Sequence, residues 1–211
     1  ISFVFALKTS SFETPSFFML SYSSTIIFST LCLVALNSFF VRGVLEIQPA
    51  IVGQIMGGES HILAIVTAAA GLGSLLASGL FGLGKLVKSQ IQKSLWPMAM
   101  LGIATTALLK TSTDLTAFIL IFITTGFTAT IVGIGAQTLI QLEVQESYRA
   151  RVMTWWSTIS FGGLVCGGTA VGFLGDLVGI DNAIWYMMLF GGVIGLLVSP
   201  NVRKLFNPSL R

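Results

Sequence analysis

The sequence predicts an all-α membrane protein with six transmembrane helices. Hydrophobic residues make up 54% of the 211 residues and charged residues only 9%, whereas a soluble domain carries roughly 25% charged residues. The mean hydropathy is +0.91. The apolar residues form long unbroken runs, unlike the ~10-residue alternating strands of a transmembrane barrel. At about 20 residues per crossing, with short turns, a chain of this length holds about six spans.

The predicted organisation is a lead-in, a transmembrane domain and a tail. Residues 1–17 are expected to be cytoplasmic or interfacial, and residues 200–211 form a basic cytoplasmic tail. Between them, the domain 18–199 is expected to hold six spans, at about 18–40, 60–84, 95–110, 115–141, 152–175 and 183–199. The stretch 41–58 carries Pro49 and several glycines, which predicts a broken, partly interfacial segment after the first span.

The basic residues predict that both ends of this domain are cytoplasmic. Six spans put nine of the eleven basic residues on one side of the membrane: Lys8, Lys85, Lys88, Lys93, Arg149, Arg151, Arg203, Lys204 and Arg211. The other side receives Arg42 and Lys110. Because cytoplasmic loops are enriched in Lys and Arg, this count favours six spans over an odd number. A bacterial inner membrane is the expected location.

Two further features concern processing and redox state. The chain begins Ile-Ser-Phe and lacks the pattern of a signal peptide, so we expect it to be a fragment of a longer protein. Cys32 and Cys166 both fall inside apolar spans, and we interpret them as small packing residues rather than a disulfide framework.

Two stretches of the sequence carry a resemblance. The first is the turn ESYRARVM (146–153), followed by a Gly-rich helix that ends GFLGDLVG (172–179). The second joins VRGVLE (41–46) and Pro49 to AAAGLG (68–73). From about residue 15 onward the chain resembles the C-terminal half of a major facilitator superfamily transporter. The second match is similar to the drug and siderophore exporters of that superfamily, such as the enterobactin and macrolide exporter group.

This resemblance implies one half of a twelve-helix major facilitator fold, with a missing N-terminal six-helix half as its partner. It implies secondary active export of a small amphipathic solute, such as a drug or siderophore, by alternating access around a midplane cavity. For coupling to protons, the expected carboxylate belongs to the missing half. The family's basic turn after its eighth helix is represented only by Gly82, Gly84, Lys85 and Lys88, without the usual acidic residue.

Uncharged polar side chains within the spans are the candidates for a substrate cavity. They are Asn37, Thr67, Gln137, Gln141 and Trp155. Each of the first four can instead form a hydrogen bond between helices. Trp155, like Trp156, can instead belong to the cytoplasmic aromatic belt.

Charged residues near the span ends are candidates for a gate or for loops that set topology. They are Arg42, Glu46, Lys85, Lys88, Glu143, Glu146, Arg149 and Arg151. Arg42 and Glu46 are spaced to pair on one helix face. Arg149 and Arg151 are most simply topology charges. Alternatively, they pair with Glu143, with Glu146 or with the other half of the transporter to lock a cytoplasmic gate.

Small residues on the fifth span predict close helix packing. Gly163 with Gly167, and Gly168 with Gly172, are spaced four residues apart, as in helices that approach one another closely. The same spacing also suits a helix that slides during alternating access.

No catalytic constellation is visible, so the sequence does not predict an enzyme, a metal site or a cofactor. His61 is the only histidine, and a metal site needs more ligands. The net charge of +3 is interpreted as loop sidedness rather than nucleic-acid binding. Two alternatives to transport stay open: a truncated, non-transporting membrane module, and a lipid-modifying enzyme. The latter needs a charged cluster at one interface, for which the only nearby residues are Arg42, Glu46, Glu59 and His61.

Overall fold

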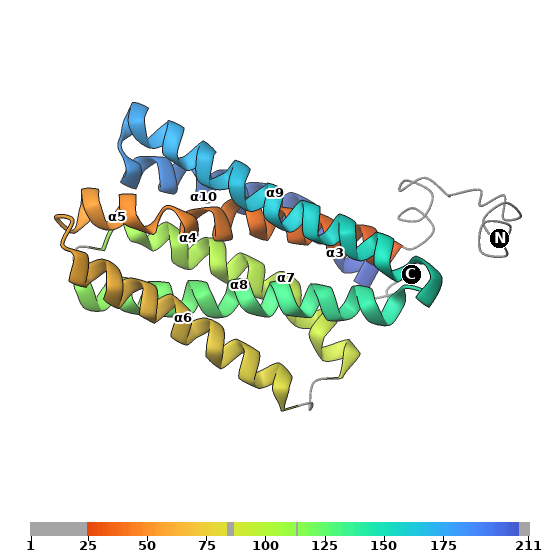
Figure 1. Cartoon of the computed structure of the whole chain (residues 1–211). Helices are drawn as coiled ribbons and strands as arrows, with labels where there is room; N and C mark the ends of the chain where they lie inside the picture. Colours follow the sequence, from red (N-terminus) through yellow and green to blue (C-terminus); the bar gives the residue numbers. More distant parts are fainter. Residues whose placement is uncertain (1–24, 84–86, 113, 207–211) are drawn as a thin grey trace, which may run out of the picture.

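The computed structural model describes residues 25–83, 87–112 and 114–206, with side chains for 26–83, 87–112 and 114–197. Every regular element in these residues is a helix (Figure 1). In chain order they are α3 (Thr25–Asn37), the π-helix η1 (Ser38–Arg42), α4 (Gly43–Glu46), α5 (Gln48–Ile55), α6 (Ser60–Gly82), α7 (Lys88–Ala107), the 3₁₀-helix η2 (Leu108–Lys110), α8 (Leu115–Glu143), α9 (Glu146–Val178) and α10 (Ile180–Phe206). The predicted lead-in 1–17 and Lys85 lie outside the described residues.

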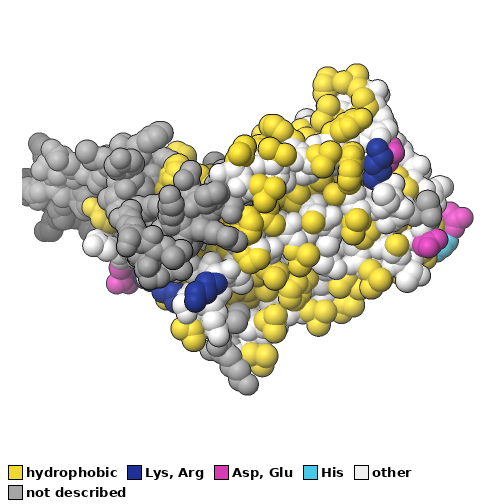
Figure 2. Space-filling view, turned by 180° about the vertical axis from the view of Figure 1, so that it is seen from behind, with side chains coloured by type: hydrophobic (Ala, Val, Ile, Leu, Met, Phe, Trp, Pro, Cys, Tyr) yellow, Lys and Arg dark blue, Asp and Glu magenta, His cyan; other side chains and the backbone are white. Residues whose placement is uncertain are grey.

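Five helical segments are long and apolar enough to cross a membrane. Within the described part of the chain they are Ile26–Glu46, Ser60–Gly82, Leu115–Glu143, Glu146–Val178 and Ile180–Leu197. They correspond to five of the six predicted spans, and their helices extend past several of the predicted limits. In Figure 2, which views the molecule from behind, apolar side chains cover the middle of the described surface.

The predicted third span, 95–110, coincides with the apolar part of α7 and with η2. This helix begins earlier than predicted, at Lys88, and is 20 residues long. Its first turns read KSQIQK (88–93), so α7 is not among the five segments that are apolar enough to cross a membrane. The structure therefore shows five candidate spans where the sequence predicts six, and the remaining helix, α7, packs beside α8 and α10.

The helices α3, η1 and α4 together form the first pass. The break after this pass follows from Pro49 and two glycines. Pro49 lies in the first turn of α5, where its missing N–H leaves no helical bond unmade. Gly57 and Gly58 have φ angles of 81° and 78°, a conformation that only glycine adopts without steric cost. The chain therefore reverses between α5 and α6, within the segment that the sequence predicts to be broken.

The core is organised around α8. This helix packs most extensively against α6 and α7, while α9 packs against η1, α4 and α3, and α10 packs against α7 and α9. Phe118 and Phe122 of α8 are fully buried, and their rings stack with centroids 6.3 Å apart. The first pass and α8 therefore form the centre of the bundle.

The helix ends gather at two ends of the bundle (Figure 1). One end, here called the basic end, holds the start of α3 and the α6–α7 and α8–α9 connections, with Lys88, Lys93, Arg149 and Arg151 alongside Glu143 and Glu146. The opposite end, here called the acidic end, holds the other connections, with Glu59, Asp114, Asp176 and Asp181 alongside Lys110 and His61. The described basic turns thus share one end of the molecule.

Candidate functional site

A cavity of about 320 Å³ lies among four passes of the bundle and is here called the polar cavity. Its walls come from η1 and α4, from α6, from α8 and from α9. The residues that line it are Arg42, Leu45, Glu46, Ser74, Ala129, Thr130, Gly133, Ile134, Gln137, Trp156 and Leu164. On α8 and α9 these residues lie well inside the helices, away from both ends. The cavity therefore brings polar side chains into the middle of an otherwise apolar bundle.

Arg42 and Glu46 supply the charge in the polar cavity. Arg42 is half-buried at the end of η1, and Glu46 lies one helical turn further on and is exposed. No ion pair joins the two side chains among the residues that the structure describes. An arginine within a membrane span costs about 2.5–3.5 kcal/mol and usually faces a functional cavity. Both residues are predicted from the sequence as gate or loop charges, and the structure places them in a cavity wall.

The structure places Trp156 in the polar cavity, whereas the sequence analysis proposes Trp155. Trp155 is 39% exposed, and adjacent helical residues point about 100° apart. Trp156, Ser160, Gly163 and Gly167 follow one another at spacings of four, three and four residues, which places them on one helix face. This stripe is a signal in the sequence that identifies Trp156 as the inward-facing tryptophan.

Ser74 and Thr130 are further cavity residues that the sequence analysis did not single out. The Ser74 hydroxyl donates to Ala70 O at 3.1 Å and lies 3.4 Å from Gly126 O, so it bridges α6 and α8. Gln137, which the sequence analysis proposes, lines the same cavity. The sequence does not distinguish Ser74 and Thr130 from other residues, because serine and threonine recur throughout the spans.

The other proposed cavity residues lie elsewhere. Asn37 is 1% exposed at the junction of α3 and η1, and its Oδ1 atom has no hydrogen-bond partner among the described residues. The Thr67 hydroxyl donates to Gln48 Oε1 at 2.9 Å, which ties α6 to α5. Gln141 is exposed near the end of α8. The structure therefore brings only Gln137 of the five proposed residues into this cavity.

Two close helix crossings flank the polar cavity. At the first, α6 crosses α8: a Cβ atom on Gly73 would lie 2.8 Å from Phe127 N, and Gly126 faces the backbone of Ala70. At the second, α9 crosses the first pass: a Cβ atom on Gly43 would lie 2.7 Å from Gly168 N, and Gly167 faces the backbone of Phe39. Both crossings bring backbone against backbone, which only glycine permits.

The proposed packing glycines of α9 divide into two groups. A Cβ atom on Gly163 would lie 3.0 Å from Ser38 Cβ, and one on Gly168 would lie 3.3 Å from Gly43 O, so both face the first pass, as Gly167 does. A Cβ atom on Gly172 would meet nothing within 4 Å. Gly172 therefore takes no part in the close crossing that Gly163, Gly167 and Gly168 form with the first pass.

The charges at the basic end are arranged around one ion pair. Lys88 at the start of α7 pairs with Glu143 at the end of α8. Glu146, Arg149 and Arg151 are exposed on the first turns of α9, and no ion pair joins either arginine to a glutamate among the described residues. The described ion pair between helices at this end is thus made by Lys88 and Glu143.

No catalytic cluster is found in the part of the chain that the structure describes. His61 Nδ1 lies 3.1 Å from Glu59 Oε2, and both side chains are about two-thirds exposed at the acidic end, apart from the Arg42–Glu46 wall. No group of three or more metal-ligating side chains occurs among the described residues.

Comparisons with known protein families, with curated proteins and with solved structures find no match.

Proposed function

We propose that the chain is one half of a secondary transporter of the major facilitator type, which exports a small amphipathic solute through the polar cavity. The observation that carries this proposal is the cavity itself, with Arg42, Glu46 and Gln137 set among apolar helices. Such a site can hold a solute with both polar and apolar parts at the bilayer midplane, where transporters of this type bind their substrates.

The symmetry of the two close crossings supports the same proposal. The first three long passes are the α3–η1–α4 helix, α6 and α7, and the next three are α8, α9 and α10. In one crossing the second helix of the first triplet, α6, packs against the first helix of the second triplet, α8. In the other crossing the roles are exchanged: the second helix of the second triplet, α9, packs against the first helix of the first triplet. The triplets start from opposite ends of the bundle (Figure 1), which is the arrangement of an inverted repeat, as found within each half of these transporters.

The proposed orientation follows from the charges. We place the basic end in the cytoplasm because Lys and Arg are enriched in cytoplasmic loops, and the bacterial inner membrane is the proposed location. The face that carries the polar cavity, formed by η1, α4, α6, α8 and α9, would then meet an N-terminal six-helix half across a shared solute path. A proton is the proposed coupling ion, with its carboxylate in that other half.

The test fills the polar cavity. A Cβ atom on Gly133 would meet nothing within 4 Å, and Gly133 lines the cavity, so Gly133→Phe places a ring there without a backbone clash. The matched control is Gly172→Phe, at a glycine that is equally free of neighbours and lines none of the described cavities. Both variants of the full-length protein are assayed in cells that lack their own exporters, with a panel of amphipathic cations, anions and zwitterions.

We expect the wild type and Gly172→Phe to lower accumulation of at least one solute, and Gly133→Phe to abolish this effect at equal membrane abundance. If no solute moves in any direction, the non-transporting membrane module is favoured instead. If Gly133→Phe transports as well as the control, a solute moves but does not pass through this cavity.

A further inference from the structure

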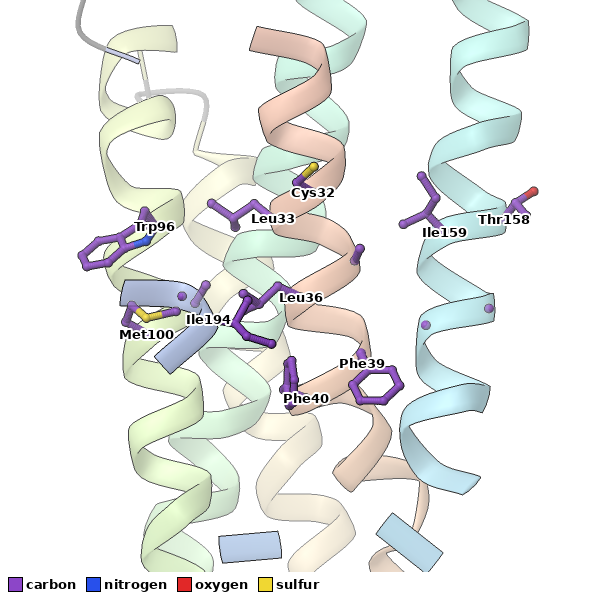
Figure 3. Close-up of a pocket in the computed structure, with 15 residues that line it drawn as sticks. Cys32, Leu33, Leu36, Phe39, Phe40, Trp96, Met100, Thr158, Ile159 and Ile194 are labelled. Carbon is purple, nitrogen blue, oxygen red and sulfur yellow. The ribbon is translucent and has the colours of Figure 1, made fainter. Parts of the chain in front are cut away.

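A second cavity, of about 620 Å³, lies between the first pass, α7, α9 and α10. Leu36 of α3 and Phe39 of η1 form one wall, Met100 of α7 and Ile194 of α10 form another, and Gly162 of α9 closes the far side. In Figure 3, Leu36, Phe40, Met100 and Ile194 gather between α3 and α7, and Ile159 points from α9 toward α3. It shares no lining residue with the polar cavity.

This hollow continues along α7 and α10. A neighbouring hollow of about 400 Å³ shares Trp96 and Met100 with it and extends to Trp185 and Ala107, near the acidic end. We call the two hollows together the apolar groove. Its shape is long rather than compact, and it runs from the middle of the bundle toward one end.

The apolar groove offers its occupant no unpaired hydroxyl. The hydroxyl of Thr158, on its wall, donates to Thr154 O within α9 at 3.0 Å. Most of the remaining lining atoms are carbon. Water is not stable in an apolar hollow without polar partners, so hydrocarbon is the favoured filling.

The groove reaches the outer surface of the bundle. Leu189 and Val193 of α10 line it and are 48% and 54% exposed. Both lie in Ile180–Leu197, one of the segments able to cross a membrane. The medium at the mouth of the groove is then the hydrocarbon of the bilayer, and the molecules that can enter from it are lipids.

The side chain of Lys110 places a positive charge at the end of the groove that lies near the acidic end of the bundle. Lys110 Nζ lies 5.9 Å from the centroid of the Trp185 ring, and Trp185 lines the groove. The same ammonium donates to Asn182 Oδ1 at 2.7 Å. An ammonium has three donors, so this bond leaves two for an anionic group at the membrane surface.

We propose that the apolar groove binds a membrane phospholipid, with one acyl chain between α7, α9 and α10 and the phosphate at Lys110. The proposal does not depend on transport through the polar cavity. A long occupant with an apolar tail and an anionic head fits both the shape of the groove and the position of the lysine.

The first test measures retained lipid. The full-length protein is purified in a mild detergent, and bound phospholipid is counted by native mass spectrometry. Gly162 lines the groove, and a Cβ atom there would meet nothing within 4 Å, so Gly162→Phe fills the groove without a backbone clash. We expect one phospholipid per wild-type chain, loss from Gly162→Phe, retention by Gly172→Phe, and about fivefold weaker binding of anionic lipid by Lys110→Gln.

The second test leaves the groove wall unchanged. Cys32 lines the groove, whereas Cys166 does not, so Cys166→Ala leaves Cys32 as the one thiol of residues 1–211. With phospholipid added at ten times its dissociation constant, we expect about tenfold slower modification of Cys32 by a membrane-permeant maleimide.

Four outcomes overturn the proposal. The first is that no lipid is retained and phospholipid leaves the rate of Cys32 modification unchanged. The second is that wild type and Gly162→Phe retain lipid equally. The third is that an exported solute, but not phospholipid, protects Cys32 from the maleimide, and the fourth is that Cys32 becomes protected when the protein dimerises in lipid-free detergent.

Discussion

Replacing Gly73 by alanine tests the closest contact in the bundle. A Cβ atom at this position would collide with the backbone of α8, at Phe127 N (2.8 Å) and at Ile123 C (2.9 Å). These neighbours are backbone atoms, so no side chain can rotate away to make room. The atom nearest to the added Cβ is the backbone oxygen of Ile123. Ordinary contacts begin at 3.4 Å, so α6 and α8 must separate by at least roughly 0.5–1 Å, and a gap of that size already forfeits a quarter to a half of each dispersion contact along the crossing.

The magnitude follows from two opposing terms. Overpacking a tight contact costs about 1–3 kcal/mol, whereas alanine in place of glycine returns up to ~1 kcal/mol of helix propensity. We therefore expect Gly73→Ala to lower the free energy of unfolding by about 1–2 kcal/mol, which changes the folded-to-unfolded ratio by roughly 5–30-fold. At Gly71, two residues away on the same helix, a Cβ atom meets nothing within 4 Å. Gly71→Ala should therefore be neutral or stabilising.

The assay is equilibrium unfolding of the purified protein in mixed detergent and dodecyl sulfate micelles, followed by circular dichroism. The two variants differ only in which face of α6 receives the methyl group, so the difference between them isolates the crossing. Equal stability of Gly73→Ala and Gly71→Ala would refute the reasoning, because α6 would then not lie in backbone contact with α8.

Three further predictions concern contacts between helices and at the basic end. A double-mutant cycle with Gln48→Leu and Thr67→Val should give a coupling free energy of about 0.6 kcal/mol; independent effects would contradict the hydrogen bond between α5 and α6. Reversing either charge of the Lys88–Glu143 pair should lower stability, and reversing both should recover up to ~1 kcal/mol of that loss. The recovery should vanish near ~1 M salt. If the effects of the two single reversals simply add at low salt, the pair does not form. Arg149→Gln should reduce transport without reducing the amount of protein in the membrane, and unchanged transport would remove Arg149 from the proposed gate.

The all-helical architecture with long apolar helices could be predicted because it follows from composition and length. Long apolar runs admit few structures other than spanning helices, and the break after the first pass is marked by Pro49, Gly57 and Gly58. The number of spans was harder to predict. The first turns of α7 are polar, and whether such a helix spans the membrane depends on what it packs against, which a hydropathy average does not contain.

The candidate site could be predicted only in part, because a cavity is defined by the rotation of each helix about its axis. Gln137 was named from its polarity within an apolar span, but Trp155 and Trp156 are equivalent by that criterion. The difference between them is set by which face of α9 meets the first pass. The Gly163–Gly167 stripe marks that face, and extending it to Ser160 and Trp156 identifies Trp156 as the tryptophan that lines the polar cavity.

Arg42 shows a second limit of sequence reasoning. Its position near the end of an apolar run predicts a gate or loop charge, and in the structure the π-helix and α4 continue the first pass beyond it. Arg42 therefore lies within a helical pass and lines the polar cavity. The continued pass packs against α9, where Gly43 lies against Gly168, and this contact cannot be read from the local sequence alone.

The central claim is that the polar cavity lies on a solute path that opens alternately to the two sides of the membrane. Thr130 lines the cavity, so its replacement by cysteine in a Cys32→Ala, Cys166→Ala background reports access directly. In proteoliposomes of known orientation, a membrane-impermeant thiol reagent should modify this cysteine from each side in turn. A cysteine replacing Val165, which is 61% exposed on α9, should react from neither side. Modification of the Thr130→Cys variant from one side only under every condition, or from neither side, would contradict the account.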